Sequence, residues 1–182
     1  RVLFRSRLKP DYAEAHNNLG VLLASIPGRQ TEAIFHHHEA IRLKPDYAEG
    51  HHNLALALSP FPARRAEALA HYNTALRLKP DYPKAHYNLA ILLASLPSGS
   101  ADAITHYTEA IRLKPDYVEA HYNLAILLGS NPSRQAEAIA HYAKVIELRP
   151  DHAEAHNNLA ALFAATPGRQ ADAVKHYTNR KS

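Results

Sequence analysis

The chain has 182 residues, of which 46% are hydrophobic and 21% charged, a formal net charge of +4, and no cysteine. The absence of cysteine excludes a disulfide framework, a thiolate metal site and a cysteine nucleophile. Its apolar runs are only a few residues long, against roughly 20 residues for a bilayer span, and no block of like charges marks a polybasic anchor. We therefore expect no membrane partner.

Residues 1–6 match nothing that recurs later, and we expect them to be a non-native scar outside the fold. From residue 7 onward the chain repeats itself. The triplet Leu-Lys-Pro or Leu-Arg-Pro begins every 35 residues, at Leu8, Leu43, Leu78, Leu113 and Leu148. A second proline recurs at the same interval from Pro27 to Pro167. Such a period predicts stacked repeats, each leaving room for two helices between its prolines.

The first predicted helix covers residues 13–25. Asp11 is expected to cap it, with Glu14 completing an acidic capping box. The residues His16, Leu19, Gly20 and Leu23 follow the spacing of one buried helical face. The second predicted helix, at about residues 31–43, is also amphipathic, and small residues on both helices predict close packing.

We therefore predict an all-α fold, a right-handed α-solenoid of antiparallel helix pairs with a 35-residue period. A single array is expected from residue 7 to residue 182. Its units are predicted at residues 13–47, 48–82, 83–117 and 118–152, with a partial unit at 153–182. The last segment still carries the inner-unit pattern of Ala173, Val174, His176 and Tyr177, so we expect exposed apolar surface and self-association through the uncapped repeat ends.

These units resemble the tetratricopeptide repeat. In the second unit, the family's pattern is matched at His51, Leu54, Ala55, Leu58, Ala68, Tyr72, Ala75 and Pro80. The resemblance covers essentially everything after residue 6. It departs from the family in having 35 rather than 34 residues per unit and histidine where tryptophan is frequent. The resemblance implies a helical scaffold for protein partners.

Fourteen histidines are the most unusual feature of the composition. Most recur with the repeat, which is expected to place copies about 10 Å apart rather than around one ion. We interpret them as structural and predict no metal site and no cofactor. There is no serine elbow and no phosphate-binding glycine loop, so we predict no catalytic residues and no enzyme activity. Metal or nucleic-acid binding remains a minor alternative, raised by the histidines and the mild basicity.

One asparagine recurs in the middle of every first helix, where its helix propensity is poor. The row comprises Asn18, Asn53, Asn88, Asn123 and Asn158. Each amide could bond a neighbouring helix and fix the stacking, or the row could line a groove and pair with the backbone of an extended peptide. Beside the row we expect Tyr87, Tyr122, His52 and Lys84, over an apolar floor of Val21, Leu56, Ile91 and Ile126.

The segments at residues 85–90 and 120–125 resemble repeats of the protein O-GlcNAc transferases, whose asparagine ladder holds substrate peptides. That resemblance favours the groove. We predict a non-catalytic protein-protein interaction scaffold that binds an extended peptide segment. The alternative is a substrate-recruiting segment of a larger enzyme such as a glycosyltransferase. The sequence identifies neither the peptide nor the localisation.

Overall fold

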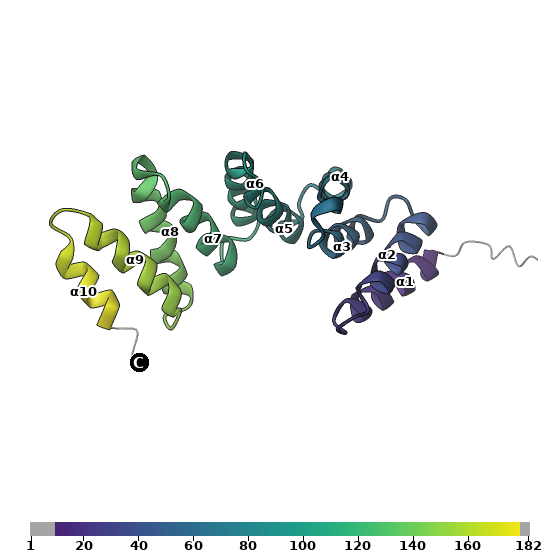
Figure 1. Ribbon diagram of the computed structural model, residues 1–182, viewed down its shortest axis with the longest axis horizontal. Helices are drawn as coiled ribbons and strands as arrows, with labels where there is room; N and C mark the ends of the chain where they lie inside the picture. The colour runs from purple at the N-terminus through teal and green to yellow at the C-terminus, as the bar shows by residue number, and fades with distance from the viewer. Residues whose placement is uncertain (1–9, 179–182) are drawn as a thin grey trace, which may run out of the picture. The chain divides into compact units, whose positions relative to one another are not determined.

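The structure is a computed structural model in which residues 10–178 are described, with side chains from residue 12 (Figure 1). The proposed scar at residues 1–6 and the side chain of Asp11 lie outside these ranges. The described chain is all α-helical, apart from its loops and two 3₁₀ turns, as predicted. Its helices are α1 (Pro10–Ala24), α2 (Gln30–Leu43), α3 (Ala48–Leu58), α4 (Arg65–Leu78), α5 (Pro83–Ala94), α6 (Ser100–Leu113), α7 (Val118–Gly129), α8 (Gln135–Leu148), α9 (Ala153–Ala165) and α10 (Gln170–Thr178).

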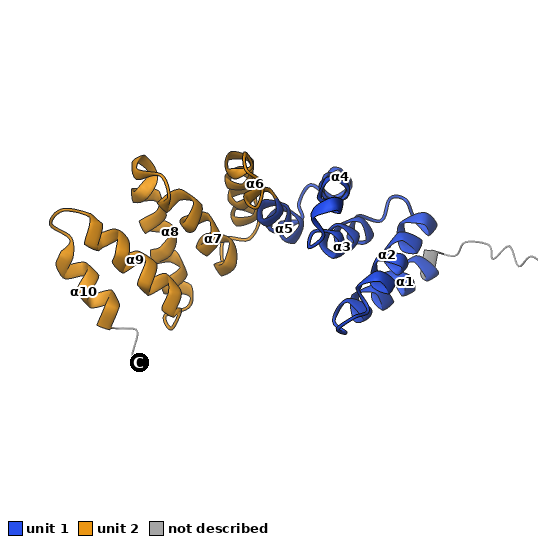
Figure 2. Ribbon diagram, viewed as in Figure 1, with its two compact units in different colours: residues 1–92 blue, residues 93–182 orange. Residues whose placement is uncertain are grey.

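The chain forms two compact units, Arg1–Leu92 and Leu93–Ser182, divided within the last turn of α5 (Figure 2). In unit 1, α1 packs on α2 and α3 packs on α4, and α3 also contacts both α1 and α2. In unit 2, the pairs are α7 with α8 and α9 with α10, joined through α8 and α9. Each unit thus stacks helix pairs as a solenoid does. The five repeat boundaries given above stay a prediction.

Alanines allow the paired helices to approach closely. Ala55 on α3 and Ala68 on α4 are fully buried, and so are their equivalents Ala125 on α7 and Ala138 on α8. Because alanine adds only a methyl group to a helix backbone, the complete burial of these residues in the packed pairs agrees with the tight packing expected from the sequence.

The first predicted buried face is only partly correct. Leu19 is 41% exposed, whereas its equivalent Leu54, one period later, is 0% exposed. The difference arises because no helix pair among the described residues precedes α1, and each repeat needs a neighbour to cover that face. The apolar surface expected on the last helix is present, since Val174 is 61% exposed.

The repeat of the Asp11 pattern also predicts that Asp46 caps α3 and Asp151 caps α9, and these two predictions are wrong. Tyr47 occupies the N-cap position of α3, and His152 occupies that of α9, where its Nδ1 accepts the backbone N–H of Ala155 at 3.3 Å. Each aspartate lies one residue before the cap, because the cap residue still has extended or other non-helical backbone. Glu49, which lies one period after Glu14 and by the same pattern would complete the capping box of α3, instead accepts a bond from Lys79 at 2.7 Å.

The loops inside the helix pairs take different forms. Gly28 and Gly168 follow the proline with φ of +82° and +81°, a conformation that glycine adopts without strain. At the equivalent positions Ala63 and Ser133 the chain forms 3₁₀ turns, Pro62–Arg64 and Pro132–Arg134, whereas at Ser98 the described chain forms none. The Pro-Gly-Arg sequences are therefore helix connections, as expected.

Candidate peptide-binding site

The asparagine row begins at an exposed position and continues through half-buried ones. Asn18 on α1 is exposed, whereas Asn53 on α3 and Asn88 on α5 are half-buried in unit 1. In unit 2, Asn123 on α7 and Asn158 on α9 are half-buried as well. These side chains are therefore partly accessible and partly in contact with the neighbouring helices.

In unit 1 the amides take part in a chain of hydrogen bonds. Asn53 donates from Nδ2 to Oδ1 of the buried Asn17 at 2.9 Å, and its own Oδ1 lies 3.0 Å from Nδ1 of His52. Asn88 donates from Nδ2 to Nε2 of His52 at 2.9 Å. Since Nε2 accepts, the ring proton of neutral His52 resides on Nδ1, where it can bond Asn53 or the hydroxyl of Tyr82.

His52 is an internal member of this chain, at 5% exposed. Burial lowers its pKa, and the positive charge of exposed Lys84 acts in the same direction. A neutral ring is required for the bond from Asn88, so burial maintains the protonation state on which the chain of bonds depends. His52 therefore contacts the asparagine row from the interior of the unit.

In unit 2 the row uses phenol hydroxyls. Asn158 donates from Nδ2 to the hydroxyls of Tyr122 and Tyr142, each at 3.3 Å. Tyr122 also stacks on the ring of His152, with centroids 4.9 Å apart. Burial raises the pKa of Tyr142 to about 12, so its hydroxyl stays neutral. The repeat thus already contains hydrogen bonds between an asparagine amide and tyrosine hydroxyls.

These hydrogen bonds leave some donors and acceptors of the asparagine amides unused. A side-chain amide has two N–H donors and an oxygen that accepts two bonds. Asn53 uses one donor for Asn17 and one acceptor position for His52. The two roles considered for the row, joining repeats and binding a peptide, are therefore compatible. The same amide can bond a neighbouring repeat and offer its remaining donor to a ligand.

The predicted apolar floor is exposed. Val21, Leu56, Ile91 and Ile126 are each among the exposed large hydrophobic side chains. Tyr87, predicted beside them on α5, is half-buried and already interacts within the chain. Amides next to exposed aliphatic side chains form a mixed surface of the kind that holds an extended peptide, with the backbone bonded and side chains packed.

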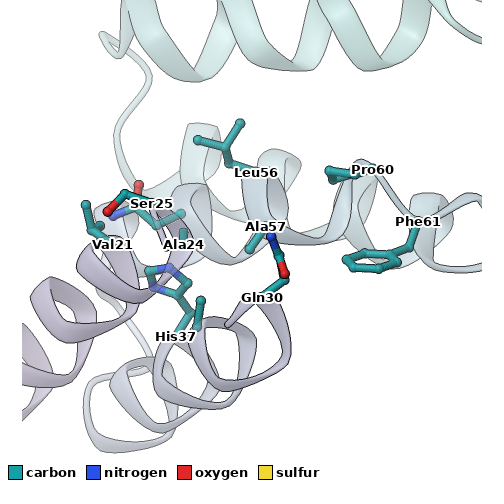
Figure 3. A pocket seen from close by; sticks show the side chains of 11 residues that line it. Val21, Ala24, Ser25, Gln30, His37, Leu56, Ala57, Pro60 and Phe61 are labelled. Carbon is teal, nitrogen blue, oxygen red and sulfur yellow. The ribbon is translucent and has the colours of Figure 1, made fainter. Parts of the chain in front are cut away.

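A cavity of about 550 Å³ opens within this surface in unit 1 (Figure 3). It lies among α1, α2, α3 and the loop that follows α3. Asn53 lines it together with Val21 and Leu56, and His37 forms part of its wall. His37 was not among the predicted site residues, although the sequence carried a signal: the equivalent position is tyrosine in all four later repeats, at Tyr72, Tyr107, Tyr142 and Tyr177.

The histidines meet in pairs across the helices of one repeat, a contact that the sequence reasoning missed. The Nδ1 atoms lie 2.8 Å apart in His16 and His36, and 2.9 Å apart in His121 and His141. Among the described residues, no group of three or more His, Asp or Glu side chains could hold a metal ion. None of the described helices has the length and apolar character of a membrane span.

Comparisons with known proteins agree with this architecture. A family model described as TPR repeat matches residues 65–96, 101–131 and 133–166, which is more than half of the chain. No curated protein matches the chain in sequence.

Several solved structures share the fold. A MamA protein superposes with a TM-score of 0.79 at 19% identity, covering 94% of this chain and 91% of the other. A MamA fragment from Desulfovibrio magneticus RS-1 gives 0.78 at 19% identity, covering 93% of both. YrrB, described as a TPR protein with an unusual peptide-binding site, gives 0.76 at 20% identity, covering 93% of this chain and 86% of its own. The matched repeats and the stacked helix pairs together show that this chain belongs to the tetratricopeptide repeat (TPR) family.

Proposed function

We propose that this chain is a non-catalytic scaffold that binds an extended peptide segment of a protein partner along its asparagine row. The carrying observation is that the half-buried amide of Asn53 has unused bonding capacity next to exposed Leu56 and Val21. A peptide backbone offers one N–H and one C=O per residue, which match a side-chain amide whatever the peptide's side chains are. Repetition of the asparagine supplies several such contacts.

The charged side chains on the first helices indicate which part of a partner chain the row would bind. Lys84 is the one basic residue in the series of positions Glu14, Glu49, Lys84, Glu119 and Glu154. In unit 2, Glu119 is itself paired with Arg149 at 3.1 Å. A peptide bound by its C-terminal carboxylate would meet mostly acidic side chains at this series, so we favour an internal segment over a free C-terminus.

The fold similarity to YrrB supports the proposal, because that protein is described as having a peptide-binding site. The site residues of the proposal are the five asparagines with Tyr87, Tyr122, His52 and Lys84. Among them, Asn53 and Asn158 line cavities, whereas His52 acts from the interior.

The test is fluorescence anisotropy with a labelled library of unstructured peptides, comparing Leu56→Asp with Phe35→Asp. Both side chains are exposed and apolar, but only Leu56 lies beside the row. We expect Leu56→Asp to weaken binding at least tenfold, because a carboxylate replaces the apolar contact, and Phe35→Asp to leave it unchanged. Equal binding by the two variants would place the peptide elsewhere.

Self-association is a second proposal for the same chain. Leu19 and Leu22 on α1 are exposed, as are Val174 and Tyr177 on α10. The position of Tyr177 is buried in the preceding repeats, at Tyr142 for example, where the next helix pair covers it. A second copy presenting α1 could cover α10 in the same manner.

A further inference from the structure

The cavity in unit 1 has an equivalent in unit 2 that shows what kind of group it can hold. The second cavity, of about 340 Å³, is lined by Ile126, Ser130, Tyr142 and Asn158 among others. These residues lie three periods of 35 residues after Val21, Ser25, His37 and Asn53, which line the first cavity. The two cavities are therefore the same place in the repeat, and the one in unit 1 is larger.

A missing phenol distinguishes the two. In unit 2 the buried Tyr142 places its hydroxyl 3.3 Å from the amide of Asn158. In unit 1 the smaller His37 stands in place of that tyrosine. The bond of Asn53 to Asn17 corresponds to the bond of Asn158 to Tyr122, so the bond to Tyr142 has no counterpart among the described residues of unit 1. The first cavity thus retains the amide of the pair without the phenol ring that accompanies it in unit 2.

Gly20 accounts for the position of His37. The equivalent residue is alanine in the other repeats, at Ala55, Ala90, Ala125 and Ala160. A Cβ atom at Gly20 would lie 2.7 Å from Cε1 and 2.8 Å from Nδ1 of His37, closer than van der Waals contact permits. His37 therefore packs into the space that alanine fills elsewhere, and the first repeat differs from the rest at both members of the pair.

His37 also has an unused polar atom. Its side chain is 1% exposed, and Nδ1 has no hydrogen-bond partner among the described residues. A buried polar atom without a partner costs free energy, which a ligand can recover by bonding it. The rest of the wall is mostly apolar and includes Ala24, Pro60 and Phe61 (Figure 3).

We propose that this cavity binds a phenol ring, namely the side chain of a tyrosine in the extended peptide. The proposal rests on the peptide-binding function above and names the side chain that the first repeat selects. The ring lies between the apolar walls, and its hydroxyl meets the free N–H of Asn53 and the imidazole of His37. A phenol can both donate and accept, so it fits either neutral tautomer of His37.

The first experiment measures binding of 4-ethylphenol and of ethylbenzene to the whole chain by NMR titration. The two probes share ring and ethyl group and differ only in the hydroxyl. We expect 4-ethylphenol to shift the signals of residues lining the cavity and to bind at least tenfold more tightly. Equal affinity for both probes would overturn the phenol assignment, and so would signal changes confined to other parts of the chain.

Two reciprocal variants localise the site. Gly20→Ala with His37→Tyr gives the first repeat the pair found in the others and places the chain's own phenol beside Asn53, as in unit 2. Probe binding should then weaken at least tenfold while circular dichroism stays helical. Ala125→Gly with Tyr142→His makes the opposite exchange in unit 2 and should create a second site. Undiminished binding by the first variant contradicts the proposal. If the second variant does not fold, the first decides alone.

Binding of matched peptides distinguishes the tyrosine pocket from the general peptide-binding function. An unstructured peptide with one tyrosine is compared with the same peptide carrying phenylalanine or alanine there. We expect the tyrosine peptide to bind at least tenfold more tightly than the phenylalanine peptide. Equal binding of all three would overturn the tyrosine pocket and leave the scaffold function standing. Binding of 4-ethylphenol without binding of any peptide would overturn the scaffold function and leave the phenol pocket standing.

Discussion

His51 on α3 and His71 on α4 face each other with their Nδ1 atoms 3.0 Å apart. Nε2 of His51 lies 3.0 Å from the carbonyl oxygen of Pro45, which can only accept, so the ring proton of His51 is on Nε2. Nδ1 of His51 is then the acceptor, and His71 donates to it. The same set of bonds recurs at His121, His141 and Pro115. The bond between the two rings needs at least one Nδ1 that can accept, so it is lost when both rings are protonated.

Acid should therefore destabilise the fold. Burial lowers the pKa of His71, His121 and His141, and lowers that of His37 to about 4. The unfolded chain, with histidine pKa values near 6.5, binds more protons than the folded chain between these limits. Stability is thus complete above about pH 6.5 and falls as the pH drops toward 4. Thermal melts at pH 7.5 and pH 5 measure the effect.

The variant His37→Tyr tests this account at one residue. A pKa of about 4 in the folded chain and about 6.5 in the unfolded one means that His37 alone costs about 2 kcal/mol at pH 5. We expect the stability difference between pH 7.5 and pH 5 to shrink by about that amount in the variant. An unchanged difference would show that His37 is not buried in its neutral form.

Gly20 and His37 should be energetically coupled. Alanine is the better helix former by roughly 1 kcal/mol, but its methyl group collides with His37. We expect Gly20→Ala to be better tolerated in the His37→Tyr background than in the original chain, with a coupling of about 0.5–3 kcal/mol. A double-mutant cycle from chemical unfolding measures it. Additive effects of the two substitutions would rule the coupling out.

Asn53 should contribute to stability as well as to binding. In Asn53→Ala, Oδ1 of the buried Asn17 loses its donor, which costs about 1–3 kcal/mol and outweighs the gain in helix propensity. The exposed Asn18 provides the matched control, and Asn18→Ala should change the free energy of unfolding by less than about 0.5 kcal/mol. Urea unfolding compares the two, and equal stabilities would argue against the Asn53–Asn17 link.

Self-association should depend on α10. Replacing the exposed Val174 and Tyr177 by lysine removes apolar surface and adds like charges, so we expect weaker association in sedimentation velocity experiments. Leu56→Lys, which changes an equally apolar exposed residue away from α10, is the control. A chain that stays monomeric at every concentration before substitution would contradict the proposed association.

Periodicity explains why much of the fold could be predicted. The spacing of prolines and apolar residues located the helix pairs, and the buried alanines Ala55 and Ala68 confirm the close packing. The aspartate caps could not be located to the residue, because the extended backbone at Tyr47 shifts the helix start. Leu19 could not be distinguished from Leu54, since exposure depends on which repeat lies beside it.

The candidate site was predicted less completely. The asparagine row was visible as a repeated residue with poor helix propensity, and its exposed neighbour Leu56 was expected. The bonds linking Asn53 to Asn17 and Asn88 to His52 were not, because they join residues 36 positions apart whose contact depends on the stacking of two repeats. His37 required comparing each position with its copies, since only there does its departure from tyrosine appear.

Peptide binding by the amide row is most directly measured by calorimetry on the triple variant Asn53→Ala, Asn88→Ala and Asn123→Ala. The titrant is an extended, unstructured peptide that binds the original chain, and circular dichroism establishes that the variant is folded at the temperature used. Three lost hydrogen bonds, each worth about 0.5–1.5 kcal/mol, predict at least a tenfold loss of affinity. Reduced stability with undiminished affinity would contradict the account, because the amides would then serve only to join the repeats.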